Sequence, residues 1–120
     1  MDNISVVKVR NILMLTIPTD PDDETISYLQ EAILNSMEKY NSKGLILDIS
    51  TVNTLDSFFA RTIVETAQMV DLMGGITIIA GMQPSVAITA TQLGLTFGKI
   101  KTTLDVDRAL TMMEEEQAGR

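Results

Sequence analysis

The clearest pattern of apolar and polar positions runs through residues 44–75, where an apolar run, a polar stretch and a helical spacing follow one another. Residues 45–49 are apolar except for Asp48, which is typical of a short strand buried on both faces. Residues 50–57 are mostly small or polar and predict a loop, after which apolar residues recur at the spacing of one helix face: Phe59, Ile63, Ala67 and Val70. The loop therefore follows the carboxyl end of a buried strand, the edge at which open α/β sheets place their sites. We expect the function to reside in this loop.

Residues 4–17 show a weaker alternation that predicts two short strands joined by a tight turn. Arg10 and Asn11 occupy the turn, and Asn tolerates the left-handed backbone that such turns need. Because charged residues such as Lys8 interrupt the apolar positions, a half-exposed antiparallel pair fits better than two buried strands. A helix should follow, with Asp20 as its N-cap and a core-facing stripe of Ile26, Leu29, Ile33, Met37 and Tyr40.

The second half of the chain alternates strands with helices. Residues 76–80 form a buried apolar run, and a third helix begins near Pro84 and stops at Gly94. Residues 97–101 predict a short edge strand, and a fourth helix opens at Asp105. The expected order is β-β-α-β-α-β-α-β-α. An opening hairpin followed by alternating elements implies an α/β fold with a single mixed sheet and helices mainly on one face.

Composition narrows the classes of function. The chain has 120 residues, enough for one domain over residues 1–120, and it contains neither histidine nor cysteine. Histidine-based catalysis, thiol nucleophiles and zinc–thiolate sites are therefore excluded, and we expect no enzyme activity, no cofactor and no metal. The net charge of -7 disfavours nucleic acid and anionic membranes as partners. Since no apolar run could span a bilayer and no signal-peptide pattern is present, we expect a cytoplasmic protein.

Ser57 is the sharpest candidate for chemistry. No histidine can take its proton and no lysine lies near it in sequence, so it is not a catalytic nucleophile. Two interpretations remain: Ser57 caps the helix, or it accepts a phosphoryl group. A phosphate would carry roughly -1.5 to -2 charges and would face helical N–H groups, while Asp56 beside it would repel the phosphate. These opposed effects predict a local change of surface and potential rather than a large refolding event.

Phe58 and Arg61 extend this candidate site along the helix. If Phe59 begins the core stripe, Phe58 lies about 100° away from it, beside charged groups such as Arg61. An aromatic ring in that position is either half-buried beneath the loop or part of a partner interface, and both interpretations stay open. In the second case the docking surface comprises Asp56, Phe58 and Arg61 around Ser57.

Two other stretches suggest phosphate chemistry less strongly. Asp48 ends an apolar strand, as the phospho-acceptor of a receiver domain does, but the first strand leads into a second strand rather than into an acidic pair and a helix. Asp48 is expected instead to accept hydrogen bonds from the loop that follows. Residues 81–85 lead into a helix but lack a glycine-rich fingerprint and the lysine of a P-loop, so ordinary turn chemistry accounts for them.

With these residues placed, the chain resembles the STAS family, the fold of bacterial anti-sigma-factor antagonists, and within it the small scaffold subunit of the stressosome. The most specific part is LILDISTVNTLDSFFARTI, residues 45–63, supported by GGITIIAGMQPSVA, residues 74–87. Simpler antagonists carry Asp-Ser followed by a small residue and glycine. This chain keeps Asp56 and Ser57 but continues with two phenylalanines, which is similar to the D-S-F-x-A-R-T-I pattern of stressosome subunits.

The resemblance implies a non-enzymatic phospho-switch. It implies that a serine kinase of the RsbT type phosphorylates Ser57, and that the unmodified chain co-assembles with RsbR-type paralogues in a large complex that holds this kinase. Phosphorylation then releases the kinase to trigger a stress-response pathway, and an RsbX-type phosphatase resets Ser57. The larger paralogues carry an additional N-terminal sensor domain, whereas this chain begins at its first strand, so the small subunit is expected.

Two alternatives belong to other classes of protein. A stand-alone anti-sigma factor antagonist would bind an anti-sigma kinase in a small complex, and the size of the complex distinguishes it from a scaffold. An enzyme or nucleotide-binding domain conflicts with the missing histidine, cysteine and phosphate loop.

Overall fold

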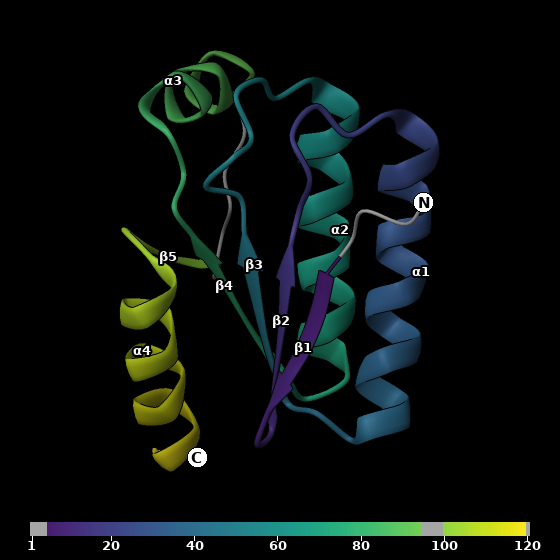
Figure 1. Ribbon diagram of the computed structural model, residues 1–120, viewed down its shortest axis with the longest axis vertical. Helices are drawn as coiled ribbons and strands as arrows, with labels where there is room; N and C mark the ends of the chain where they lie inside the picture. The colour runs from purple at the N-terminus through teal and green to yellow at the C-terminus, as the bar shows by residue number, and fades with distance from the viewer. Residues whose placement is uncertain (1–4, 95–99, 120) are drawn as a thin grey trace.

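A computed structural model describes residues 5–94 and 100–119 of the chain (Figure 1). The described residues form five strands and four helices in the predicted order. Their bounds are β1 (Ser5–Val9), β2 (Ile12–Thr16), α1 (Asp23–Tyr40), β3 (Gly44–Asp48), α2 (Ser57–Leu72), β4 (Ile76–Ala80), α3 (Pro84–Gln92), β5 (Lys101–Thr103) and α4 (Val106–Ala118). The prediction of a mixed α/β sheet with an opening hairpin is confirmed.

The strands form one sheet in the order β1-β2-β3-β4-β5, with β1 antiparallel to β2 and every other neighbouring pair parallel. Because the spatial order follows the chain order, right-handed crossovers place α1, α2 and α3 on the same face. Their core residues pack in one cluster with the inward residues of β2 and β3. Helix α4 covers the opposite face, where Ala109 and Met113 pack on Ile12, Ile46 and Ile78. Helices therefore lie mainly on one face, as predicted.

The hairpin differs from its prediction in one strand. β1 is exposed except at Val9, which is half-buried, but most of β2 is buried, with Ile12, Leu13 and Leu15 at 2% exposure or less. The reason is that β2 is an inner strand, paired with β1 on one side and with β3 on the other. At the turn, Arg10 rather than Asn11 takes the left-handed backbone, with φ of 53°.

The start of α1 lies two residues later than predicted. Asp20 itself has a left-handed φ of 51°, and Asp22 is the N-cap, with its carboxylate accepting a hydrogen bond from the Thr25 N–H at 2.7 Å. Hydrogen bonds from Thr25, first of the side chain and then of the backbone, lower the pKa of Asp22. The predicted stripe is buried at Ile26, Leu29, Ile33 and Met37, whereas Tyr40 in the last turn is exposed.

The predicted edge strand overlaps β5 only at Lys101, because β5 covers Lys101–Thr103. Residues 97–99 of that prediction lie outside the described residues. The fourth helix follows as predicted, with Asp105 as the N-cap of α4 and its carboxylate accepting from the Arg108 N–H at 2.8 Å.

Candidate phosphorylation and docking site

The loop between β3 and α2, residues 49–56, is held firmly at the carboxyl edge of the sheet. Val52 and Leu55 anchor it from below, because their side chains are 0% and 6% exposed. On one side, the Thr51 hydroxyl donates to the carbonyl of Ile17 after β2, at 3.2 Å. The β3–α2 loop is therefore a rigid platform rather than a loose connection.

The other side of the β3–α2 loop rests on the residues that follow β4. The Gln83 amide donates to the carbonyl of Ser50 at 2.7 Å, and the Ser85 hydroxyl donates to the carbonyl of Asn53 at 3.3 Å. Gly81, directly after β4, has φ of 79°, and a Cβ there would stand 2.8 Å from the Ser50 Cβ. The close approach requires glycine at this position.

Asp48 serves this loop, as its sequence interpretation predicts. Its carboxylate accepts a hydrogen bond from the Ser50 N–H at 3.0 Å. This bond turns the chain at the end of β3, and it gives the carboxylate a structural partner. The same contact agrees with the exclusion of a receiver domain on topology.

Asp56, not Ser57, caps α2. Asp56 has an extended backbone, with φ of -97° and ψ of 172°, and its carboxylate accepts from the Phe59 N–H at 2.7 Å. Ser57 is the first helical residue and is exposed, and its hydroxyl bonds to no group in the part of the chain that the structure describes. The interpretation of Ser57 as the helix cap is therefore wrong. The cap must be extended, and the chain is extended at Asp56, one residue earlier.

The first turn of α2 separates a buried from an exposed phenylalanine. Phe59 is 2% exposed and belongs to the core, whereas Phe58 is 37% exposed. Arg61 is exposed one helical turn after Ser57, which places the two side chains on the same side of the helix. The structure thus brings Asp56, Ser57, Phe58 and Arg61 together on one surface, which we call the α2 entry surface.

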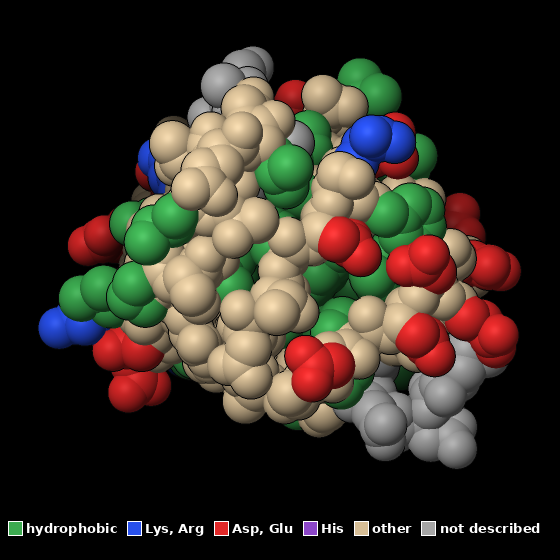
Figure 2. Space-filling view, turned by 90° about the horizontal axis from the view of Figure 1, so that it is seen from above, with side chains coloured by type: hydrophobic (Ala, Val, Ile, Leu, Met, Phe, Trp, Pro, Cys, Tyr) green, Lys and Arg blue, Asp and Glu red, His purple; other side chains and the backbone are tan. Residues whose placement is uncertain are grey.

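The α2 entry surface lies at an acidic end of the molecule. The helices α1 and α2 pack side by side and both begin at this end, which Figure 2 shows from above. Four exposed carboxylates stand at the start of α1, namely Asp20, Asp22, Asp23 and Glu24. Asp56 adds a fifth carboxylate at the start of α2. The cation nearest to Ser57 in sequence is Arg61. A phosphate on Ser57 would add negative charge to this end.

Sequence reasoning found the α2 entry surface but missed the residues that hold the loop below it. Thr51, Gln83 and Ser85 each make a hydrogen bond to a residue more than 30 positions away in the chain. The single signal for them was their position after a buried strand, at the edge where parallel strands end together. Their bonding partners are set by how neighbouring loops meet in space.

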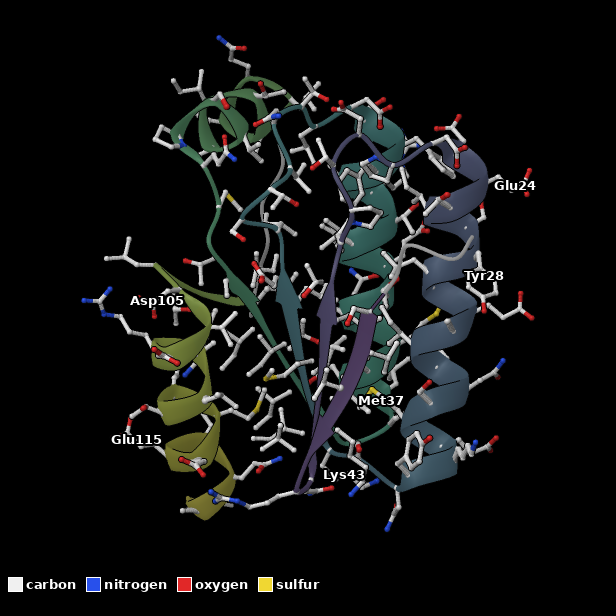
Figure 3. All side chains as sticks on the ribbon, in the orientation of Figure 1. Glu24, Tyr28, Met37, Lys43, Asp105 and Glu115 are labelled. Carbon is white, nitrogen blue, oxygen red and sulfur yellow. The ribbon has the colours of Figure 1, made fainter. Side chains whose placement is uncertain are left out.

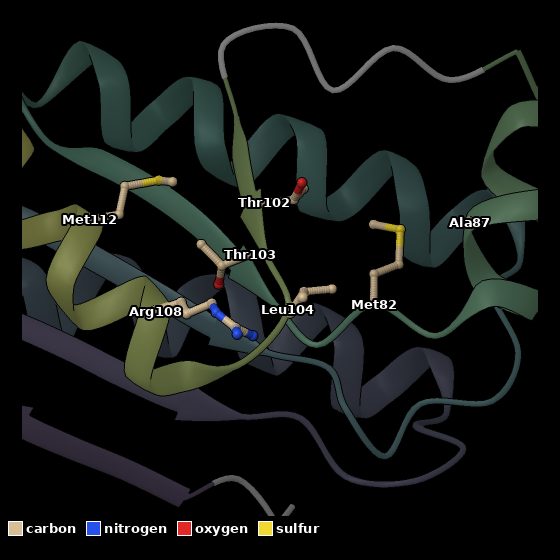
Figure 4. Close-up of a pocket in the computed structure, with 7 residues that line it drawn as sticks. All are labelled: Met82, Ala87, Thr102, Thr103, Leu104, Arg108 and Met112. Atoms are coloured by element: carbon tan, nitrogen blue, oxygen red, sulfur yellow. The ribbon is translucent and has the colours of Figure 1, made fainter.

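A cavity of about 490 Å³ lies elsewhere, between α3, β5 and α4 (Figure 4). Its lining is mainly apolar, and its one charged group, Arg108, is bound to Asp105 at 3.1 Å. None of the predicted site residues lines it. Within residues 5–94 and 100–119, no group of three or more acidic side chains could hold a metal ion. None of the described helices is both long and apolar enough to cross a membrane.

Known proteins resemble this chain over its whole fold. The structure of RsbS from Moorella thermoacetica, in a variant with glutamate in place of a serine, gives a TM-score of 0.86 at 26% identity, covering 98% of this chain and 99% of that chain. A chain in a structure of the stressosome, a signal integration and transduction hub, gives a TM-score of 0.78 at 27% identity, over 94% of this chain and 98% of that chain. The RsbT co-antagonist protein RsbRA of Bacillus subtilis is 28% identical over 110 residues, 88% of this chain. This chain spans 40% of the length of RsbRA.

A family model, that of the STAS domain, matches residues 3–109. The match includes the whole α2 entry surface and every strand of the sheet. It agrees with the mixed sheet, the opening hairpin and the helix arrangement described above. The chain therefore belongs to the STAS family, as its sequence motifs predict.

Proposed function

We propose that this chain is a non-enzymatic scaffold subunit of a stressosome-type complex, with Ser57 as its phosphorylation switch. In the unphosphorylated form the α2 entry surface holds an RsbT-type serine kinase, and phosphorylation of Ser57 releases it to trigger a stress-response pathway. The observation that carries the proposal is that the helix cap and the exposed hydroxyl at the start of α2 belong to different residues. Asp56 supplies the cap, so the exposed Ser57 hydroxyl is left available for modification.

The phosphoryl transfer requires no catalytic group from this chain. The kinase transfers the γ-phosphoryl group of ATP to the Ser57 oxygen, a P–O bond to ADP breaks, and the hydroxyl proton leaves to a base of the kinase. The chain must only present the hydroxyl on a fixed surface. The anchored β3–α2 loop and the first turn of α2 satisfy that requirement, since Val52, Leu55 and Phe59 are buried directly around the exposed serine.

The release step follows from charge and position. A phosphate adds roughly -1.5 to -2 charges directly beside Asp56 and at the acidic end of the molecule. Phe58, which would insert into a partner, lies next to the modified residue, so a docked surface must accommodate both the added volume and the added charge. The hydrogen bonds that hold the loop do not involve Ser57, and the fold therefore stays the same.

The relatives support assembly as well as switching. The structure of Moorella RsbS matches over nearly the full length of both chains, and the related RsbR proteins are named RsbT co-antagonists. We therefore propose RsbR-type paralogues as assembly partners, an RsbX-type phosphatase for reset, and the cytoplasm as the location. A stand-alone antagonist remains the second candidate, and it would form a small complex in place of a stressosome-sized particle.

The first test is phosphate mapping. The purified chain is incubated with an RsbT-type kinase and ATP–magnesium, and the modified residue is located by mass spectrometry. We expect phosphate on Ser57, none on Ser57→Ala, and normal modification of Thr54→Ala, a matched change of an exposed hydroxyl in the same loop. Phosphate on another residue, or none from a kinase that is active on a second substrate, would contradict the proposal.

The second test concerns docking and size. Ser57→Asp should fold normally and bind the kinase more weakly than wild type, while Ser57→Asn, similar in size but neutral, should bind more tightly than Ser57→Asp. Equal affinity of all three would contradict release by charge. Mixing with an RsbR-type paralogue and measuring mass by light scattering separates the two candidates, because only the scaffold yields a particle of many subunits.

A further inference from the structure

We infer that Arg61 is the internal partner of a phosphate on Ser57. Once Ser57 is phosphorylated, the Arg61 guanidinium binds the phosphate from one turn further along α2 and is withdrawn from the α2 entry surface. This pairing rests on the proposed phosphorylation of Ser57. It adds a physical reason for release of the kinase, because the docked partner loses a cation as well as meeting a new negative charge.

Arg61 occupies the position from which a long side chain reaches Ser57. Ser57 opens α2 and Arg61 follows four residues later, so the two lie one turn apart on the same side of the helix. Cα–Cβ bonds in a helix tilt toward its N-terminus, and a side chain at position 61 therefore extends back over the turn that begins at Ser57. Because the Cβ atoms of such a pair are about 5–6 Å apart, a phosphate on the serine oxygen comes within reach of the guanidinium.

Neither side chain has a competing partner in the part of the chain that the structure describes. Ser57 and Arg61 are both exposed, and neither side chain takes part in an ion pair or a hydrogen bond there. Other cations of the described chain are held by carboxylates, namely Arg10 by Glu114, Lys101 by Glu116 and Arg108 by Asp105. Arg61 is therefore available to an anion that appears beside it.

Two carboxylates lie near Arg61 in sequence, and both are less suited to hold it. Glu65 follows Arg61 by four residues, and a helical ion pair in which the anion follows the cation is the weaker order. A phosphate on Ser57 precedes Arg61 by four residues, which is the stronger order. Asp56 lies outside this spacing, and its carboxylate already accepts from the Phe59 N–H at 2.7 Å.

The chemistry of the two groups strengthens the pair. A guanidinium donates two parallel N–H hydrogen bonds to two oxygens of one phosphate, a geometry that the point charge of lysine does not reproduce. The phosphate carries roughly -1.5 to -2 charges and three acceptor oxygens. No covalent bond forms or breaks at Arg61. The guanidinium only changes its partner, from solvent or a docked protein to the phosphate.

Capture of Arg61 alters the α2 entry surface without refolding it. Before modification the surface offers a cation in the same turn as Phe58, whose ring is 37% exposed. After modification the guanidinium is engaged within the helix, and it neutralises part of the added charge. A partner that used Arg61 therefore loses that contact, while the core residue Phe59 and the Asp56 cap stay in place.

The pairing is tested without the kinase. Phosphoserine is installed at position 57 during translation, and the second pKa of its phosphate, ordinarily about 6, is followed by phosphorus NMR. Because the guanidinium favours the doubly charged phosphate, Arg61→Gln should raise this pKa by about 0.3 or more. The control Lys39→Gln removes a positive charge from the last turn of α1, near Met37 and far from Glu24 of the first turn (Figure 3), and should leave the pKa unchanged. No rise in Arg61→Gln, or an equal rise in both variants, would overturn the inference.

Kinase affinity tests the consequence for docking. Unphosphorylated Arg61→Gln should bind the RsbT-type kinase about threefold or more weakly than wild type. Phosphoserine at position 57 should then lower the affinity by a smaller factor in Arg61→Gln than in the wild-type chain, because the cation is already missing. Equal factors in the two backgrounds would overturn the role of Arg61 in release. A kinase that binds neither unphosphorylated chain would instead contradict the proposed function, and the phosphorus titration would still decide the pairing.

Discussion

At the start of α2, neighbouring residues have different roles: some stabilise the helix and others are exposed to solvent. The Asp56 carboxylate satisfies the N–H of Phe59, which otherwise would lack an intrahelical partner. Ser57 contributes no side-chain hydrogen bond to the described structure, and Phe58 leaves part of its ring in solvent while Phe59 fills the core. Within four residues the chain thus places two accessible side chains, Ser57 and Phe58, between two structural ones, Asp56 and Phe59. Substitutions at these positions should therefore separate stability from binding.

Replacing the cap and the serine should have unequal effects on stability. Asp56→Ala removes the cap and should cost about 0.5–2 kcal/mol of unfolding free energy. Ser57→Ala removes an exposed hydroxyl and should change the unfolding free energy by no more than about 0.5 kcal/mol. Urea denaturation followed by circular dichroism measures both. A larger cost for Ser57→Ala than for Asp56→Ala would contradict the cap assignment.

The two phenylalanines offer the same contrast for binding. Phe58→Ala should leave the fold intact and weaken kinase binding at least about tenfold, as expected for an aromatic interface residue. Phe59→Ala should cost about 3–5 kcal/mol of stability, because its ring is buried. Calorimetric titration of folded variants with the kinase checks the first effect. Unchanged affinity in Phe58→Ala would remove Phe58 from the docking surface.

At the scale of elements, the β3–α2 loop owes its shape to the loops on either side. Thr51 binds backward to the end of β2, and Gln83 and Ser85 bind it from the β4–α3 turn. The parallel neighbours β2, β3 and β4 end at the same edge, which is why these loops meet. The position of Ser57 therefore depends on three separate connections of the sheet.

A pair of glycines tests this dependence. Gly81→Ala places a Cβ 2.8 Å from the Ser50 Cβ at a left-handed φ of 79°. Gly74 has a similar φ of 83°, but a Cβ there meets nothing within 4 Å. Gly74→Ala should cost about 1–2 kcal/mol from the backbone alone, and Gly81→Ala should cost more. Urea denaturation compares them, and equal costs would show that the turn does not press on the β3–α2 loop.

At the scale of the whole molecule, the strand order separates two surfaces. The α2 entry surface lies at the carboxyl ends of the parallel strands, whereas β1 forms a lateral edge of the sheet. Both surfaces come from the same sheet and need no hinge.

The two surfaces should act independently. Val7→Lys should be phosphorylated on Ser57 at the wild-type rate, and Ser57→Asp should keep the wild-type solution mass. The physical reason is that the first lies at the lateral edge of the sheet and the second at its carboxyl end (Figure 1). Kinase assays and sedimentation measure the two properties. A mass change in Ser57→Asp would show that the surfaces are coupled.

The order of elements and the location of the candidate site were predictable from local pattern. Residues 45–49 are apolar, and the helical spacing of Phe59, Ile63, Ala67 and Val70 depends on near neighbours alone. The STAS motif around Ser57 could be recognised for the same reason, because it is a contiguous stretch of sequence. Helix starts were missed by one or two residues at Asp22 and Asp56, because aspartate and serine are similar caps and backbone angles decide between them.

The sequence by itself determined which segments are strands and helices, which side chains fill the core of α2, and that chemistry by histidine, cysteine or zinc–thiolate sites is absent. Only the tertiary structure decided that β2 is an inner strand, that Thr51, Gln83 and Ser85 hold the loop, and that β1 is left open. Secondary structure follows from periodicity over a few residues. Strand neighbours and loop contacts join residues far apart in the chain, and no local pattern encodes which pairs will meet.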